Sequence, residues 1–204
     1  MTTRRPATPP APGSRERGER DVWHITPFQP TGPYPQVMLD LPTGAAIPLS
    51  AAARGERIVI DGRLLDGNGA PIFDAMIETW QADSSGRYAH PHDPRGAEAD
   101  PDFWGYRRVA TDSDGRFRID TIKPGALRDR AQAPHLLVGI YGGGVLYRYV
   151  TRIYFDDEPD NVTDPILQLV PAQRRETLMA RGEGGVYRFE IRLQGDCETV
   201  FFDV

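Results

Sequence analysis

Hydrophobic and polar residues alternate along several short stretches of the chain, as they do in strands that bury one face. Asp66-Gly67-Asn68-Gly69 separates two of these stretches and predicts a hairpin turn, because such pairs readily supply residues with positive φ. In residues 75–80 either Met76 or Ile77 is buried on one face, with Trp80 near the other end. The predicted strands are residues 57–65, 75–80, 111–119 (a turn followed by a strand), 136–139, 147–155 and 186–193.

One helix is predicted, at residues 172–181, where turn-forming residues are missing and Gly182 provides a stop. At least six short strands with a single short helix predict an all-β fold. The chain has 21 glycines and 19 prolines in 204 residues, which implies frequent turns and favours the same class. The expected architecture is a prealbumin-like β-sandwich with long loops, one short helix and an extended N-terminal arm.

The domain organisation follows from where apolar residues gather. Residues 1–21 contain prolines and arginines but almost nothing large and apolar, which predicts a flexible tail. Residues 22–55 form a proline-rich extended arm with Thr31-Gly32-Pro33-Tyr34 at its centre. Such an arm packs over its own domain or over a neighbouring subunit, and both possibilities stay open. The β-sandwich domain is expected at residues 56–204.

Composition narrows the function classes. A formal net charge of -5 and a pI near 5.4 argue against a nucleic-acid surface. No apolar run approaches the ~20 residues that a membrane span needs. The single cysteine, Cys197, excludes an internal disulfide and suggests a reducing compartment. We therefore expect a cytoplasmic protein.

The connection between Ala82 and Tyr106 is too long for a plain hairpin, and loops of this length in compact domains are generally functional or form an interface. It contains His90-Pro91-His92-Asp93, which could offer two imidazoles and a carboxylate to a metal. A proline-rich loop gives such ligands little rigidity, so solvated loop histidines are the alternative interpretation.

A set of motifs in fixed order resembles the intradiol ring-cleaving dioxygenase family, and the resemblance spans roughly Pro27 to the C-terminus. Without it, the glycine and turn pattern would equally suit a plain β-sandwich binding module. The motifs are Thr79-Trp80-Gln81-Ala82-Asp83, Gly86-Arg87-Tyr88, Thr111-Asp112-Ser113-Asp114-Gly115, Ile122-Lys123-Pro124-Gly125, Ala133-Pro134-His135 and Arg152-Ile153-Tyr154-Phe155.

The resemblance implies an incomplete iron site. Catalytic members hold ferric iron with two tyrosines and two histidines, and the first of each pair falls at Tyr88 and His135. The second tyrosine and the second histidine fall at Leu127 and Leu137, which cannot ligate a metal. An arginine of the catalytic chains falls at Gln132. We therefore expect no metal and no catalytic residue in this chain, with Tyr88 and His135 as remnants of the ligand set.

Longer runs around residues 152–158, 173–178, 187–192 and 194–203 match one branch of the family, in which an iron-free alpha chain and a homologous beta chain carrying Fe(III) form a heteromer. The resemblance implies that the assembly cleaves protocatechuate with dioxygen. It places the substrate-cleft wall of this chain at Thr31, Gly32, Pro33, Tyr34 and Gly143, the last where an arginine is expected. The alternatives are a stand-alone dioxygenase with an aberrant iron site and a non-enzymatic binding module.

Overall fold

The computed structural model describes Leu39, residues 48–142 and residues 147–203. The tail at residues 1–21, the arm residues Thr31 to Tyr34, and Gly143 lie outside this part. The strands are β1 (Arg57–Leu65), β2 (Ala75–Trp80), β3 (Tyr106–Ala110), β4 (Arg116–Ile122), β5 (His135–Gly142), β6 (Tyr149–Phe155), β7 (Met179–Glu183) and β8 (Val186–Arg192). The helices are the 3-10 turns η1 (Gly96–Glu98), η2 (Arg128–Arg130), η3 (Pro159–Val162) and η4 (Ala172–Leu178) and the α-helix α2 (Pro165–Leu169).

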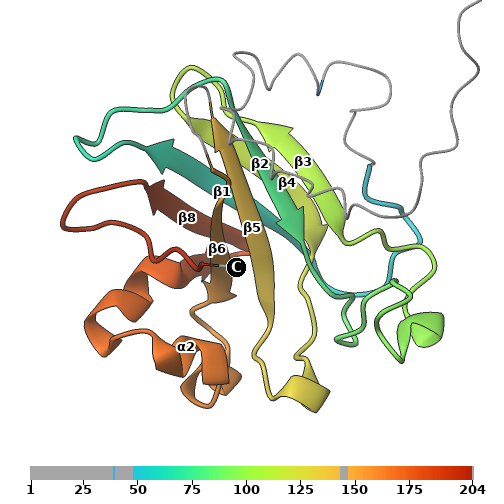
Figure 1. The fold of residues 1–204 in the computed structure, drawn as a ribbon. Coiled ribbons are helices and arrows are strands. Elements are labelled where there is room, and N and C mark those ends of the chain that lie inside the picture. Colours follow the sequence, from blue (N-terminus) through green and yellow to red (C-terminus); the bar gives the residue numbers. More distant parts are fainter. Residues whose placement is uncertain (1–38, 40–47, 143–146, 204) are drawn as a thin grey trace, which may run out of the picture.

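The eight strands are hydrogen-bonded in the order β3-β2-β5-β6-β7-β8-β1-β4. Neighbours are antiparallel except in the pairs β1–β8 and β6–β7, and β6–β7 is joined through only two residue pairs, Tyr154 with Met179 and Phe155 with Ala180. The helices η3, α2 and η4 lie together on one side of the molecule (orange), whereas η2 (yellow) and η1 (green) lie apart from them (Figure 1). The all-β prediction is confirmed, and the finer prediction of a prealbumin-like sandwich stays a prediction.

The core is formed by inward-facing residues from the β3-β2-β5-β6 strands and from the β7-β8-β1-β4 strands. In β1 the alternation buries Ile58, Ile60 and Leu64 and leaves the residues between them partly exposed. Gly62 lies on the same buried face. A Cβ at this position would lie 2.0 Å from the ring of Phe117, so only glycine leaves room for that ring. The same cluster includes buried side chains of β2, β4, β5, β6, β7 and β8. This main apolar cluster therefore determines which face of these strands is left for the surface, and two smaller clusters of buried residues complete the core of the described residues.

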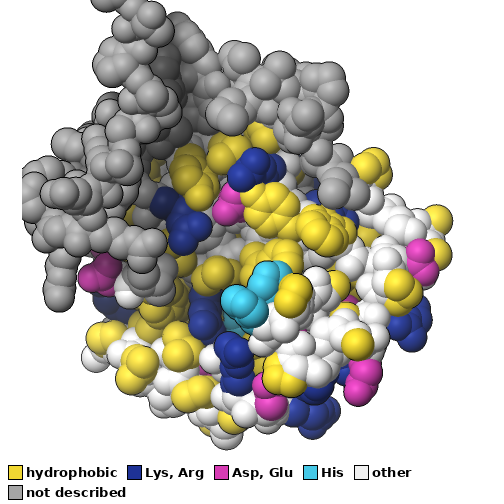
Figure 2. Space-filling model, turned by 45° about the vertical axis from the view of Figure 1, so that its right-hand side comes forward, with side chains coloured by type: hydrophobic (Ala, Val, Ile, Leu, Met, Phe, Trp, Pro, Cys, Tyr) yellow, Lys and Arg dark blue, Asp and Glu magenta, His cyan; other side chains and the backbone are white. Residues whose placement is uncertain are grey.

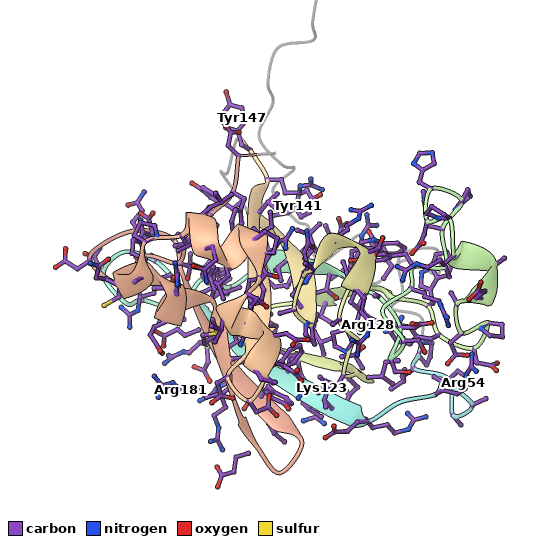
Figure 3. The ribbon with its side chains drawn as sticks, turned by 90° about the horizontal axis from the view of Figure 1, so that it is seen from below. Arg54, Lys123, Arg128, Tyr141, Tyr147 and Arg181 are labelled. Carbon is purple, nitrogen blue, oxygen red and sulfur yellow. The ribbon has the colours of Figure 1, made fainter. Side chains whose placement is uncertain are left out.

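A partly buried cation, Lys123, connects the end of β4 to the end of β6. The Nζ of Lys123 lies 2.9 Å from Asp157 and 2.7 Å from Glu158, and it also lies 5.5 Å from the centre of the Phe155 ring. Viewed from below, Arg54 and Arg181 lie on opposite sides of the molecule with Lys123 between them (Figure 3). The two carboxylates and the aromatic ring stabilise the positive charge of Lys123, whose partial burial would otherwise be costly.

The predicted helix at residues 172–181 is wrong in type and in extent. Residues 172–178 form the 3-10 helix η4, and the chain then enters β7, where Gly182 pairs with Tyr187 of β8 instead of ending a helix. Burial of Leu178 and Ala180 follows a period of two, which suits a strand. The α-helix lies just before, at α2. The sequence analysis does not predict β3 or β7, while its other strands agree with the structure to within a few residues.

Ile77 is the buried member of the pair in β2, and Met76 is partly exposed. Cys197 is exposed and unpaired within the described residues. No helix in the described part of the chain is both long and apolar enough to cross a membrane.

Candidate functional site: a pocket beside the long loop

Three neighbouring strands form the floor of a pocket on the outer face of the β3-β2-β5-β6 group. Trp80 at the end of β2 is opposite Leu137 of β5, and Leu137 is opposite Arg152 of β6. Residues opposite one another on adjacent strands have their side chains on the same face. His135 lies two residues before Leu137 on β5, so it shares this face.

Buried carboxylates shape the long loop between β2 and β3, which forms one wall. The carboxylate of Asp83 accepts hydrogen bonds from the backbone N–H of Ser85, Arg87 and Asp100 at 2.8 to 3.0 Å. Asp93 accepts from the backbone N–H of Tyr88 at 2.9 Å and of Arg95 at 2.8 Å. These bonds satisfy backbone donors of an irregular segment, which would otherwise be costly to bury.

A tight turn between β4 and β5 forms the opposite wall. Leu127 and Gln132 are bridged by two backbone hydrogen bonds, 2.9 and 3.1 Å long, which close a loop around η2. Ala131 adopts a left-handed conformation with φ of 52° to complete the turn. Leu127 is 4% exposed, so its isobutyl group is packed into the protein.

The floor and walls enclose a pocket of about 340 Å3, named here the Tyr88–His135 pocket. Figure 2 shows the histidine side chains (cyan) at the middle of one face, with basic and hydrophobic side chains around them. The residues that line it are Trp80, Tyr88, His90, His92, Asp93, Pro94, Arg95, Leu127, Asp129, Arg130, Gln132, His135, Leu137 and Arg152. The structure thus brings together all four positions that the family resemblance assigns to iron ligands, and Gln132 with them.

His135 is buried and neutral. Its Nδ1 lies 2.7 Å from the carbonyl oxygen of Ala133, and because a carbonyl only accepts, Nδ1 carries the proton. The Nε2 atom is then an acceptor, and His135 lines the pocket while only 5% exposed. Burial, and next the positive charge of Arg152, lower the pKa of His135 to about 4.

Tyr88 also stays neutral. Burial raises the pKa of its phenol, and the nearby charges of Arg152 and Arg130 only partly oppose this. Its ring stacks on Trp80 with ring centres 5.6 Å apart and planes inclined by 14°. The stack holds the phenol ring against the floor of the pocket.

These residues do not fit ferric iron. A trivalent ion needs hard, partly anionic donors on several sides, and Leu127 and Leu137 offer none. The nearby Asp93 uses both carboxylate oxygens on backbone N–H groups, and His90 accepts a hydrogen bond at Nδ1 from the backbone N–H of His92 at 3.1 Å. In the described ranges no group of three or more His, Cys, Asp or Glu side chains is arranged to hold a metal ion. No chemical step is derived through iron in this chain.

The sequence analysis gives no role in the pocket to Asp164, which it does not name, or to Arg152, which it names only within a family motif. Asp164 has no exposed side-chain surface and accepts from the N–H of Ile166, Leu167 and Ala133 and from the hydroxyl of Tyr154. It joins the start of α2 to the strand that carries His135. The sequence signal for Asp164 is the pair Asp164-Pro165, because an N-cap aspartate followed by proline is typical of a helix start. Arg152 has no such local signal, because its place in the pocket depends on the pairing of β5 with β6.

Comparison with known proteins identifies the family. The model of the Dioxygenase family matches residues 32–195. A protocatechuate 3,4-dioxygenase alpha chain of Burkholderia cepacia is 41% identical over 195 residues, which cover 88% of this chain and 97% of the relative.

This chain belongs to the intradiol ring-cleavage dioxygenases.

The beta chain of protocatechuate 3,4-dioxygenase from Burkholderia cepacia is 40% identical to this intradiol dioxygenase family member, over 69% of this chain and 66% of the relative. The dioxygenase domain of a dioxygenase carbohydrate-binding protein fusion from Streptomyces sp. SirexAA-E has the same fold. It superposes with a TM-score of 0.56 and 24% identity, over 84% of this chain and 99% of that domain. Intradiol dioxygenases use ferric non-haem iron. The family resemblance drawn from the sequence is therefore confirmed.

Proposed function

We propose that this chain is an iron-free alpha subunit of a heteromeric protocatechuate 3,4-dioxygenase. A homologous beta chain would carry Fe(III), and the assembly would insert both atoms of dioxygen into protocatechuate to give 3-carboxy-cis,cis-muconate. The observation that carries the proposal is the pair of isobutyl groups, Leu127 and Leu137, in the pocket where two iron ligands are expected. The near-complete coverage of an alpha-chain relative supports the same assignment.

Within this proposal the chain supplies structural support and part of the substrate cleft. Thr31, Gly32, Pro33, Tyr34 and Gly143 would line the cleft that it shares with the beta chain. We retain the division into a tail (1–21), an arm (22–55) and a prealbumin-like β-sandwich domain (56–204), and a cytoplasmic location. The Tyr88–His135 pocket would bind no iron and would not cleave substrate.

Co-expression with an iron-bearing homologue tests the proposal. An obligate interface is larger and more apolar than a transient one, so the chain expressed alone should self-associate or aggregate. With the partner it should give a soluble complex of equal numbers of both chains that consumes protocatechuate. The chain purified by itself should be colourless and contain far less than one iron atom per chain.

The alternatives give different outcomes. Stoichiometric iron and a visible charge-transfer band in the isolated chain would favour a stand-alone dioxygenase with an aberrant site. A well-behaved monomer that ignores every iron-bearing homologue would favour a binding module.

A further inference from the structure

We propose that the Tyr88–His135 pocket binds an aromatic carboxylate that carries one hydroxyl group, and holds it unreacted. This goes beyond the proposed function, which gives the pocket no ligand. The pocket has three kinds of surface that match the three parts of such a molecule: guanidinium groups without a carboxylate partner, a hydrogen-bond acceptor at the pocket surface, and apolar side chains.

The positive side of the pocket matches a carboxylate. Arg95 is already compensated, because its Nη2 lies 3.0 Å from Asp129 and its Nε 3.6 Å from Asp93. Within the described residues, Arg130 and Arg152 form no ion pair with a carboxylate. Three arginines therefore face two aspartates, which leaves an excess of positive charge in the pocket.

Arg152 is oriented by its neighbours and still has donors to offer. Its Nη1 donates to the Oε1 of Gln132 at 3.3 Å and to the hydroxyl of Tyr154 at 3.2 Å, and its guanidinium lies 5.9 Å from the centre of the Phe202 ring. Its Nε and Nη2 groups donate no hydrogen bond to the described residues. A guanidinium held by one nitrogen, with two donors left on another edge, suits the paired oxygens of a carboxylate.

An acceptor at the pocket surface matches a hydroxyl group. The Nε2 of His135 has no hydrogen-bond partner among the described residues, and the side chain, 5% exposed, lines the pocket. An O–H group of a ligand can donate to this nitrogen in place of water. An ionised carboxylate has no proton to give, so the two ends of the ligand are distinguished.

The apolar surface matches a single ring. Leu137 lies in the floor of the pocket and Leu127 in the wall formed by the turn between β4 and β5. The stacked rings of Trp80 and Tyr88 add aromatic surface. The pocket volume of about 340 Å3 is near the lower end of the ~300–1,000 Å3 found for ligand pockets. Inorganic phosphate has no apolar part to fill this space and would leave the leucines in contact with water.

Equilibrium dialysis of labelled 4-hydroxybenzoate against the full-length chain, with any partner that co-purifies, tests the proposal. This probe has the carboxylate and one hydroxyl but lacks the adjacent hydroxyl needed for ring cleavage. Unlabelled benzoate and phenol should compete at least tenfold more weakly, because each lacks one of the two polar groups. Inorganic phosphate should not compete at millimolar concentration.

Substitutions in this chain separate its pocket from any site in a partner. Arg152→Met should weaken binding at the pocket at least tenfold, and Leu137→Trp should remove one bound probe per chain by filling the space. The matched control is Arg118→Met, which removes an exposed arginine of β4 that pairs with Asp120 and should change nothing. Circular dichroism of each variant verifies that it is folded.

A ferric site in the partner is followed in the same samples by its visible absorption, which these substitutions should leave unchanged. Unaltered probe stoichiometry in folded Arg152→Met and Leu137→Trp proteins would overturn the proposal, as would equal competition by phosphate. If no complex forms with a co-expressed iron-bearing homologue, the proposed function fails, but the binding measurement on this chain still decides the present inference.

Discussion

His135 should make the stability of the protein depend on pH in a window where few other groups titrate. In the unfolded chain an imidazole has a pKa near 6.5, and in the folded chain burial and Arg152 lower the pKa of His135 to about 4. As the pH falls through 6.5, the unfolded state takes up a proton that the folded state refuses. Stability is therefore complete above about pH 6.5 and is lost between there and about pH 4.

The size of the effect follows from the two pKa values. Each pKa unit corresponds to about 1.4 kcal/mol, so the whole difference is worth about 3 kcal/mol, of which about 2 kcal/mol is lost between pH 7 and pH 5. The pKa values of Asp93 and Asp100 are lowered, since backbone N–H groups and arginines stabilise the charged forms against the opposing effect of burial. Those carboxylates lose their contribution only below about pH 4, outside the window.

Urea-induced unfolding at pH 7, 6 and 5 gives the measurement, with the native protein compared with His135→Gln. Glutamine does not titrate, so the free energies of unfolding of the two proteins should converge by about 2 kcal/mol from pH 7 to pH 5. Comparing the two at each pH removes contributions that they share, including those of a co-purified partner. His90→Gln is the matched control, because that side chain is exposed in the folded state as well. Parallel curves for the native protein and His135→Gln would refute a buried, neutral His135.

Three further results are expected. Restoring both missing ligands with Leu127→Tyr and Leu137→His should give weak iron binding with a visible band, measured by iron analysis and absorption, and either change alone should not; iron uptake by a single variant would contradict this. Gly86→Ala should destabilise the fold by more than 2 kcal/mol in urea unfolding, because it combines a φ of 72° with a Cβ placed 2.0 Å from a backbone carbonyl oxygen. Gly184→Ala, with a φ of 60° and no atom within 4 Å, should cost only about 1 kcal/mol, and equal losses would show that the contact is unimportant. In the assembled enzyme, Gly32→Val should raise KM for protocatechuate by an amount worth roughly 1–3 kcal/mol with iron content unchanged, whereas deletion of residues 1–20 should leave the kinetics alone.

Local pattern was sufficient for most of the strands. The alternation in residues 57–65 depends only on which face is buried, so β1 agrees with the sequence prediction residue by residue. It was insufficient at β7, because residues 172–181 have the composition of a helix, yet only residues 172–178 are helical and the chain from Met179 onward pairs with β6 and β8. β3 is not predicted because two consecutive arginines, Arg107 and Arg108, interrupt the alternation of apolar and polar residues. In the structure Arg107 is buried and Arg108 is partly exposed.

The site shows the same division between local and long-range information. The positions of Tyr88, Leu127, His135 and Leu137 follow from family resemblance, and the structure brings them to one pocket. The contribution of Arg152 could not be predicted, because it depends on the register of β5 against β6. Register is set by the whole hydrophobic pattern of both strands and by the turns around them.

The carboxylates that order the loop around the pocket separate its shape from its chemistry. In a metal centre the ion itself commonly ties loops together, and losing a ligand then loosens the fold. Here Asp83, Asp93 and Asp164 tie the same segments through backbone N–H groups, so the scaffold does not rely on what fills the middle. Hydrogen bonds within the chain therefore shape the pocket walls, and a replacement among the exposed side chains that face the pocket changes its chemistry more than the course of the backbone around it.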